Sequence, residues 1–445
     1  MSLLTNSVAV LIITSFAAAP EGSWPQFRGP AGDGQLKEIN SPTKWDESTN
    51  IAWKVPIPGA GWSQPVITGD KIFVTTAVSE KSEKPKNMSQ GTSDTRSMFG
   101  NTKPPETVYR WEVICLDAKT GQLLWEKVAA EQKPGIPIHP SNTYATETPA
   151  TDGKHVFAYF APIGKVVSFD LTGNLVWEVD VGVGPIANGM GTGSSPITLD
   201  GKLILQSDNE EKSFLLALDG STGKEDWKVE RGKGTSWSSP YVWRNKDREE
   251  LVVCGASKIE SYDPASGKLL WNSTSIKSGF SASPVGNADM LFVGNSPPLS
   301  TSPLLAVKAG ASGDITLPKG AKSSEWTPWS RIKSGPGLAS PIVVGDLLYI
   351  PTDSFLNCYD TKSGERLYRE RLPEARHIVA CPWVVGDKLF ILDEDGNTFV
   401  VKLGPAFELL GVNKLEDTFW ASPAIAGDMV LLRGVEKLYA IKQAK

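Results

Sequence analysis

A short box recurs eight times along this chain. In its clearest copy, Ala421-Ser-Pro423 opens an apolar stretch, Gly427-Asp428 forms a turn, and the apolar run Met429–Leu432 returns. The box prolines are Pro65, Pro149, Pro196, Pro240, Pro284, Pro341, Pro382 and Pro423. They are 84 residues apart in the first interval and 41 to 57 apart in the other six. A repeat near this length that is built of strand-like runs is typical of a β-propeller or a solenoid.

Several boxes are followed by a second signature that ends in tryptophan. An aspartate precedes a glycine by three or four residues, and the tryptophan comes four residues after the glycine. The copies are Asp117–Trp125, Asp170–Trp177, Asp219–Trp227 and Asp263–Trp271. Aspartate and glycine are turn residues, so the signature predicts a hairpin between two strands. Each unit then has four short antiparallel strands, which is a propeller blade, and we expect the tryptophans to pack between blades.

The last unit is one strand short. Only 22 residues follow Pro423, which leaves room for three strands. A strand-like run with a tryptophan, Asn50–Ile57, precedes the first box and supplies the fourth. We therefore predict that it pairs with Lys437–Ile441 and closes an all-β, eight-bladed propeller over residues 49–445, since closure removes open sheet edges. The Pro/Gly-rich residues 20–48 are expected to form an irregular strap.

Two units depart from the pattern. The first carries an insertion, Ser79–Val108, that is rich in Lys, Ser, Gly and Pro and includes Arg96. We expect it to be mobile and to lie over the face where the innermost strands begin, as a lid, a partner-binding arm or an unconstrained loop. The fifth unit has Val307–Gly310 where an aspartate turn is expected, and its tryptophans, Trp326 and Trp329, come late.

The N-terminus predicts export. An apolar run, Val8–Phe16, and Ala17-Ala18-Ala19 read as a signal peptide over residues 1–19, although no lysine or arginine precedes the run. The run is too short to span a bilayer, and no other long apolar stretch follows. We therefore expect a periplasmic or secreted protein, without a transmembrane segment and monomeric.

The charge pattern bears on whether the chain binds nucleic acid, and the positions of the cysteines bear on whether it forms disulfides. The net charge is −5 and basic residues are interspersed with acidic ones, which gives no electrostatic footprint for nucleic acid. The four cysteines occupy places that small residues fill in other copies of the repeat, so we expect buried thiols and no disulfides. They are Cys115, Cys254, Cys358 and Cys381.

The two signatures together resemble the tryptophan-docking repeat of the PQQ-like eight-bladed propellers, over about residues 50 to 445. That superfamily includes quinoprotein alcohol dehydrogenases and an outer-membrane assembly scaffold lipoprotein. The resemblance implies either PQQ with a divalent ion such as calcium, or a scaffold without a cofactor, because one fold hosts both. The chain lacks the adjacent cysteine pair and the Cys-x-x-Cys-His haem site of the dehydrogenases, and its first cysteine, Cys115, is too late for a lipoprotein.

If each box opens an innermost strand, the residues before its proline line the mouth of the central channel. Two places before the proline, Glu147 stands alone among serines and alanines. It is either a metal ligand or acid/base group with a perturbed pKa, or a strand-end glutamate bonded to neighbouring hydroxyls. Three places before the proline are Trp62, Trp237 and Trp420, which either stack on a planar ligand, sugar or peptide, or plug the channel.

The remaining polar residues and motifs give little indication of metal binding or catalysis. Arg376 and His377 lie in a connection on the mouth side, and no two histidines have metal-ligand spacing, so we predict no metal site from them. The acidic run Asp393–Asn397 resembles the start of a calcium loop but lacks the acidic twelfth residue, since Gly404 is there, and is better read as a hairpin. No Gly-x-Ser-x-Gly motif is present.

The sequence favours a binding function. We expect an exported scaffold of the cell envelope that offers its channel mouth to a protein, a peptide or a glycan, with no cofactor. The alternative is a small quinoprotein-like oxidoreductase in which Glu147 lies near PQQ and a divalent ion.

Overall fold

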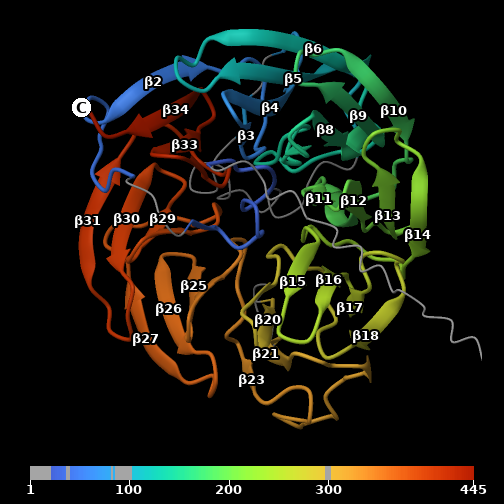
Figure 1. The fold of residues 1–445 in the computed structure, drawn as a ribbon, viewed down its shortest axis with the longest axis vertical. Coiled ribbons are helices and arrows are strands. Elements are labelled where there is room, and N and C mark those ends of the chain that lie inside the picture. Colours follow the sequence, from blue (N-terminus) through green and yellow to red (C-terminus); the bar gives the residue numbers. More distant parts are fainter. Residues whose placement is uncertain (1–21, 37–40, 82–83, 86–102, 296–301, 445) are drawn as a thin grey trace, which may run out of the picture.

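The structure is a computed structural model that describes residues 22–36, 41–81, 84–85, 103–295 and 302–444. The predicted signal peptide, and Lys86 and Arg96 with most of the insertion, lie outside these residues. The described residues form eight β-sheets arranged in a ring (Figure 1). The chain is an all-β, eight-bladed propeller of four-stranded antiparallel blades, as the repeat predicts.

The strands follow the chain around the ring. Blade 1 contains β3 (Val66–Thr68), β4 (Lys71–Val78), β5 (Tyr109–Asp117) and β6 (Leu123–Gln132). Blade 2 contains β7 (Ala150–Thr151), β8 (His155–Phe160), β9 (Lys165–Asp170) and β10 (Leu175–Asp180). Blade 3 contains β11 (Ile197–Leu199), β12 (Lys202–Ser207), β13 (Phe214–Asp219) and β14 (Glu225–Glu230). Blade 4 contains β15 (Tyr241–Arg244), β16 (Glu249–Cys254), β17 (Ile259–Tyr262) and β18 (Leu269–Ser273), and β22 (Gly313–Asp314) is added in parallel to β18.

The second half repeats the scheme. Blade 5 contains β19 (Val285–Gly286), β20 (Met290–Gly294), β21 (Pro303–Lys308) and β23 (Ser330–Ile332). Blade 6 contains β24 (Ile342–Val344), β25 (Leu347–Thr352), β26 (Phe355–Asp360) and β27 (Arg366–Arg371). Blade 7 contains β28 (Trp383–Val385), β29 (Lys388–Leu392), β30 (Asn397–Lys402) and β31 (Leu409–Lys414), and β1 (Gln35–Leu36) is added in parallel to β28. Blade 8 contains β32 (Ala424–Ala426), β33 (Met429–Arg433), β34 (Lys437–Lys442) and β2 (Ile51–Pro56). Short 3₁₀ turns occur at η2 (Ala161–Ile163) and η3 (Ala187–Gly189).

The two ends of the chain close the ring in blade 8. Strand β2 pairs antiparallel with β34, with Trp53 opposite Ala440 and Val55 opposite Leu438. In Figure 1 the blue β2 lies beside the red β34. This is the closure that the short last unit predicts.

A tryptophan from each of several outer strands docks on the next blade. The Trp53 indole donates a hydrogen bond to the Ala118 carbonyl at 3.1 Å, and its ring lies over Gly121. A Cβ at Gly121 would lie 2.7 Å from that ring, so the turn glycine is needed both for its positive φ of 73° and for the close approach. The same contact recurs at the pairs Trp125/Gly173, Trp177/Gly223, Trp227/Gly267 and Trp329/Gly364.

The fifth unit keeps this contact although its sequence spacing is lost. Trp329 docks on Gly364 of blade 6 and donates to the Thr361 carbonyl at 2.9 Å. Because blade 5 has no aspartate turn to receive the tryptophan of blade 4, the Trp271 indole donates to the buried Glu250 carboxylate at 2.6 Å. Trp271 still packs in a cluster that joins blades 4 and 5.

The N-terminal strap crosses one end of the channel, where the innermost strands end. Trp24 forms a β-bridge with Ile67 in blade 1, and the Thr198 amide of blade 3 donates to the Gln26 side chain at 2.8 Å. The Val384 amide of blade 7 donates to the Gly34 carbonyl at 3.0 Å. The dark blue segment at the centre of Figure 1 is this strap. It enters the channel from the end opposite the mouth and reaches the box residues, because the Arg28 amide donates to the Gln64 side chain at 2.8 Å and the Arg28 guanidinium donates to the Pro341 carbonyl at 2.5 Å.

The four cysteines are buried and free. Within the described part of the chain, none of the helical segments has the length and apolarity that a bilayer crossing requires.

Candidate functional site

The mouth of the channel is braced by a belt of hydrogen bonds between blades. The residue just before seven of the eight box prolines donates its backbone N–H to the side chain of the equivalent residue in the next blade. The donor–acceptor pairs are Gln64–Thr148, Thr148–Ser195, Ser195–Ser239, Ser239–Ser283, Ser283–Ser340, Ser340–Cys381 and Cys381–Ser422. The oxygen-accepted bonds are 2.9–3.0 Å, and the Cys381 thiol accepts at 3.4 Å. Cys381 is therefore a hydrogen-bond acceptor as well as a small buried residue.

Removing one hydroxyl tests the belt. We expect Ser283→Ala to lower the free energy of unfolding by about 1–3 kcal/mol, because it leaves the buried Ser239 amide without an acceptor. Ser283→Cys keeps an acceptor of the kind that Cys381 supplies and is expected to cost less. Urea unfolding curves of the two variants measure the difference. Equal losses for alanine and cysteine would show that packing, and not hydrogen bonding, sets the cost.

Glu147 comes directly before Thr148 of this belt, and its side chain is 1 % exposed. Within the described residues, neither of its carboxylate oxygens has a hydrogen-bond partner. Burial raises the pKa of Glu147 to about 7, and the nearby Thr192 hydroxyl, which is outside hydrogen-bonding geometry, lowers it by less. The surface-facing, hydroxyl-bonded glutamate offered by one interpretation of the sequence is therefore wrong. Glu147 is therefore a buried carboxyl whose protonation state changes near neutral pH.

Two of the three mouth tryptophans form a pair. Trp62 of blade 1 and Trp420 of blade 8 stack with ring centroids 5.7 Å apart and planes 21° apart. The Trp62 indole donates to the Ser141 carbonyl at 2.8 Å, and the Trp420 indole donates to the buried Glu394 carboxylate at 3.3 Å. Trp62 is buried and Trp420 is half-buried. One ring thus packs beneath the rim, and the other presents part of its surface.

Trp237 belongs to blade 4, on the other side of the ring. Its indole donates to the Gly191 carbonyl at 2.7 Å, and the side chain is half-buried. The structure therefore does not bring Trp237 together with the Trp62–Trp420 pair. The polar atom of each mouth tryptophan is already used within the protein, so what Trp237 and Trp420 offer to a ligand is ring surface.

Arg376 and His377 lie in the connection between β27 and β28. The Arg376 amide donates to Asp393 Oδ2 at 3.0 Å, and its 63 % exposed side chain lies 3.6 Å from Asp395. The His377 carbonyl accepts from the Glu394 amide at 2.9 Å. These contacts join the connection to the hairpin that carries Glu394, and through Glu394 to Trp420.

The acidic run Asp393–Asn397 is a hairpin turn. Asp393 Oδ1 accepts from the Asn397 amide at 2.8 Å, and burial raises the pKa of Asp393. Over the described residues, no group of three or more His, Cys, Asp or Glu side chains is placed to hold a metal ion.

The insertion begins at the mouth. Lys84 donates to the carbonyls of Gly59 at 3.0 Å and Val435 at 3.3 Å, which lie in connections on the mouth side of blades 1 and 8. The parts of the predicted lid or arm that fall within the described residues are 79–81, 84–85 and 103–108.

Sequence reasoning missed Arg433, a buried cation at the mouth. The side chain is 2 % exposed and donates to the Ser63 carbonyl at 3.1 Å and to the Ser63 hydroxyl. Burial lowers the pKa of Arg433 to about 9, and no carboxylate among the described residues pairs with it. The sequence contains a signal for it, because Arg433 is a charged residue at a strand end where other blades have uncharged ones. Those residues are Thr75, Tyr159 and Leu392.

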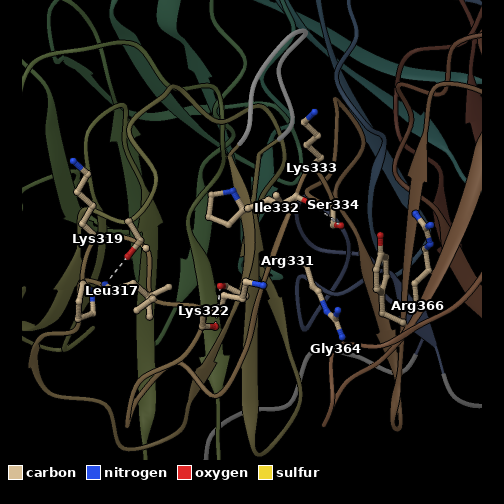
Figure 2. Close-up of a pocket in the computed structure, with 16 residues that line it drawn as sticks. Leu317, Lys319, Lys322, Arg331, Ile332, Lys333, Ser334, Gly364 and Arg366 are labelled. Carbon is tan, nitrogen blue, oxygen red and sulfur yellow. Dashed lines mark hydrogen bonds between the residues drawn. The ribbon is translucent and has the colours of Figure 1, made fainter.

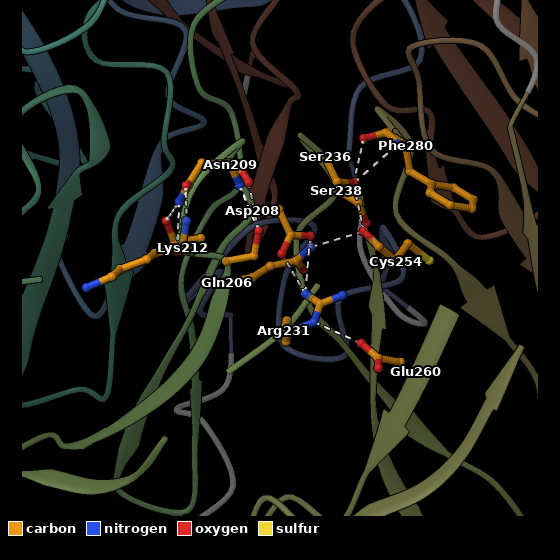
Figure 3. Close-up of polar contacts among 12 residues, drawn as sticks. Gln206, Asp208, Asn209, Lys212, Arg231, Ser236, Ser238, Cys254, Glu260 and Phe280 are labelled. Atoms are coloured by element: carbon orange, nitrogen blue, oxygen red, sulfur yellow. Dashed lines mark hydrogen bonds and ion pairs between the residues drawn. The ribbon is translucent and has the colours of Figure 1, made fainter. Parts of the chain in front are cut away.

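A second missed group is an ion cluster between blades 3 and 4 (Figure 3). Arg231 Nη1 lies 2.9 Å from Asp208, and Arg231 Nε lies 3.0 Å from Glu260. Gln206 also donates to Asp208 at 2.7 Å, and burial raises the pKa of Asp208. Each charge of the cluster is paired, and the pairs join blade 3 to blade 4. A cavity of about 20 Å³ beside it, lined in part by Tyr159, has room for about one water.

A larger cavity, of about 760 Å³, lies away from the mouth at the outer edge of blades 5 and 6 (Figure 2). Nothing in the repeat singles it out. Its lining is strongly basic, with Lys319, Lys322, Arg331, Lys333 and Arg366.

The family is decided by residues 109–368, which match the model described as "Outer membrane protein assembly factor BamB". The match covers more than half of the chain. This chain belongs to the BamB family. The resemblance to PQQ-like propellers is thereby confirmed. No curated protein matches the chain.

Solved structures support the same fold at low sequence identity. BamB from Moraxella catarrhalis is 12 % identical, with a TM-score of 0.56, over 89 % of this chain and 97 % of that one. A europium-containing methanol dehydrogenase is 13 % identical, with a TM-score of 0.57, over 94 % and 90 %. The quinohemoprotein alcohol dehydrogenase from Comamonas testosteroni is 12 % identical, with a TM-score of 0.58, over 96 % and 82 %. These likenesses show the propeller and leave its role to the site.

The described mouth of this BamB-family chain fits a quinone cofactor poorly. PQQ is a planar anion, and a divalent ion beside it needs several oxygen ligands. Trp62 and Trp420 are stacked on each other, which leaves no slot between their rings, and Glu147 has no second carboxylate in a metal-binding group with it. The described residues do not supply such a site.

Proposed function

We propose that this BamB-family chain is a binding scaffold of the cell envelope, periplasmic or secreted, whose channel mouth receives a polypeptide partner. The main support is the two half-buried rings of Trp237 and Trp420, whose indole N–H groups are already engaged within the protein. Aromatic surface that is held rigid gives contact area at low entropic cost, which is what interface anchors need. The family's namesake is an outer-membrane protein assembly factor, which supports an envelope location and a protein partner.

The rest of the mouth suits binding better than chemistry. The belt of interblade hydrogen bonds fixes the positions of the rim residues before a partner arrives. Arg376 adds an exposed cation near Trp420, through the hairpin that both contact. The strap enters the channel from the opposite end, so the mouth is the end that a partner would approach.

The alternative is a small quinoprotein-like oxidoreductase. It is supported by the two dehydrogenases among the similar structures and by Glu147, a buried carboxyl whose pKa suits proton transfer. The stacked tryptophans and the absence of a metal-binding group among the described residues weigh against it.

Photo-crosslinking in cells tests the scaffold. We expect a photoreactive residue at Arg376 to give a recurrent protein adduct, and one at Lys119, in the turn between β5 and β6 on the opposite face, to give none. Trp237→Ala/Trp420→Ala should reduce the Arg376 adduct about tenfold, as the loss of two anchor rings predicts. An unchanged thermal midpoint would show that the double variant is folded.

A cofactor titration separates the two functions. Ligand that binds only the folded state raises the thermal midpoint. A clear rise with PQQ and calcium that Glu147→Gln abolishes would overturn the scaffold and support the oxidoreductase. An adduct that is equally strong from Arg376 and Lys119, or that is unaffected by the tryptophan substitutions, would also overturn the proposed mouth site.

A further inference from the structure

The cavity of about 760 Å³ at the outer edge of blades 5 and 6, which we call the basic groove, lies where the repeat is irregular. Strand β23 is only three residues long, and the segment before it, which includes β22, is drawn toward blade 4 by pairing with β18. The Ile315 amide then donates to the Asn272 carbonyl at 2.9 Å, and the Leu317 amide donates to the Ser275 hydroxyl at 2.9 Å. The displaced segment leaves about 760 Å³ between itself, β23 and β27.

The charged residues that line this basic groove are all positive. Sixteen residues line it, and none is acidic. The cations come from three elements: the displaced segment, the end of β23, and β27. They are Lys319, Lys322, Arg331, Lys333 and Arg366. All five side chains are exposed, and none has an ion pair within the described residues, whereas many other basic residues of the protein do.

This concentration of charge is unusual for the chain. The protein carries 45 basic and 50 acidic residues, so its average surface is slightly negative. Five unpaired cations around one concave site focus a positive potential there and attract anions. Lys333 also has a φ of 54°, a left-handed conformation that is uncommon for a residue with a side chain. The backbone at the groove edge is thus held in a costly shape by its surroundings.

We propose that this basic groove binds a ligand that carries two or more phosphate groups. The planar forks of Arg331 and Arg366 suit bidentate contact with phosphate oxygens, and the lysines add point charges. The volume is well above that of one phosphate and is in the range of small-molecule sites. Figure 2 shows Arg331 extending toward Gly364, with Arg366 on the neighbouring strand and Lys322 on the opposite side.

The lining also has an apolar part. Pro303, Leu317 and Pro318 line the groove, and Ile332 is 70 % exposed between two of the cations. A ring or chain that joins the phosphates can pack there. The phosphates can come from a soluble phosphorylated compound or from an anionic lipid headgroup, since the two present the same chemistry to the groove. The site is independent of the channel mouth and of the function proposed for it.

Tripolyphosphate is a suitable probe of the shared chemistry. We expect calorimetric titration at low salt to show binding that weakens as salt rises, because the contact is electrostatic. Arg331→Gln/Arg366→Gln should weaken binding about tenfold or more. Lys119→Gln/Lys268→Gln changes the net charge by the same amount at exposed turns outside the groove, and we expect it to change affinity less than about twofold.

The outcomes are distinct. No binding of tripolyphosphate to the wild-type protein, or equal weakening by the groove and control substitutions, would overturn the proposal. Sedimentation with phosphatidylcholine vesicles, with and without phosphatidylglycerol, then separates the sources. Anionic vesicles that bind and are displaced by tripolyphosphate identify a headgroup site. Tripolyphosphate binding without vesicle binding identifies a soluble phosphorylated ligand.

Discussion

Trp53→Ala is expected to lower the free energy of unfolding by about 3–5 kcal/mol, which is the usual cost of removing a buried aromatic side chain. Trp53 lies on β2, the strand that joins the start of the propeller to its last blade. Its ring packs over Gly121 of blade 1, and its indole donates to the Ala118 carbonyl. The substitution therefore weakens the contact between blades 8 and 1, next to the pairing of β2 with β34 that closes the ring without a covalent link.

Trp53→Phe separates the two parts of that contact. Phenylalanine keeps an aromatic ring over Gly121 but loses the hydrogen bond to Ala118, so we expect a loss of only about 1 kcal/mol. Guanidinium unfolding followed by far-ultraviolet circular dichroism measures both variants. If the alanine variant is as stable as the phenylalanine variant, ring docking at the closure does not stabilise the propeller.

Much of the fold is predictable from sequence because a propeller blade is a local structure. The prolines, the turn glycines and the tryptophans recur at fixed spacing, and each repeat contacts chiefly its neighbours. The pairing of β2 with β34 is predictable for the same reason, since a missing strand at one end matched a surplus strand at the other. Even the place of Trp62 beside Trp420 follows from the closure of the ring.

The site was less predictable because its properties depend on contacts between distant segments. That Glu147 lacks partners depends on how blades 2 and 3 pack, which its box does not encode. The hydroxyls of the belt are visible in the sequence, but their acceptor role depends on the register between blades. The basic groove depends on the pairing of β22 with β18, a parallel contact that no repeat position predicts.

Glu147→Gln is expected to remove a pH dependence of stability. The pKa of Glu147 is about 7 in the folded protein, raised by burial from an ordinary value of 4.5. The folded state therefore holds its proton more strongly than the unfolded state. The wild-type protein should lose stability as the pH rises from about 4.5 through about 7, by up to about 3 kcal/mol, and should lose no more from this group above that range.

Glutamine is neutral throughout, so the difference in unfolding free energy between the variant and the wild type should grow in favour of the variant between pH 4.5 and pH 8. Any constant cost of burying the amide cancels in that comparison. Glu131→Gln, on the exposed outer strand β6, removes a carboxyl without a buried site and is expected to follow the wild-type curve. Urea unfolding at several pH values measures all three proteins. If Glu147→Gln and the wild type keep a constant difference, Glu147 is charged in the folded protein over the whole range. Water or a cation must then stabilise that charge in solution, and a bound metal ion there would return the mouth to the oxidoreductase alternative.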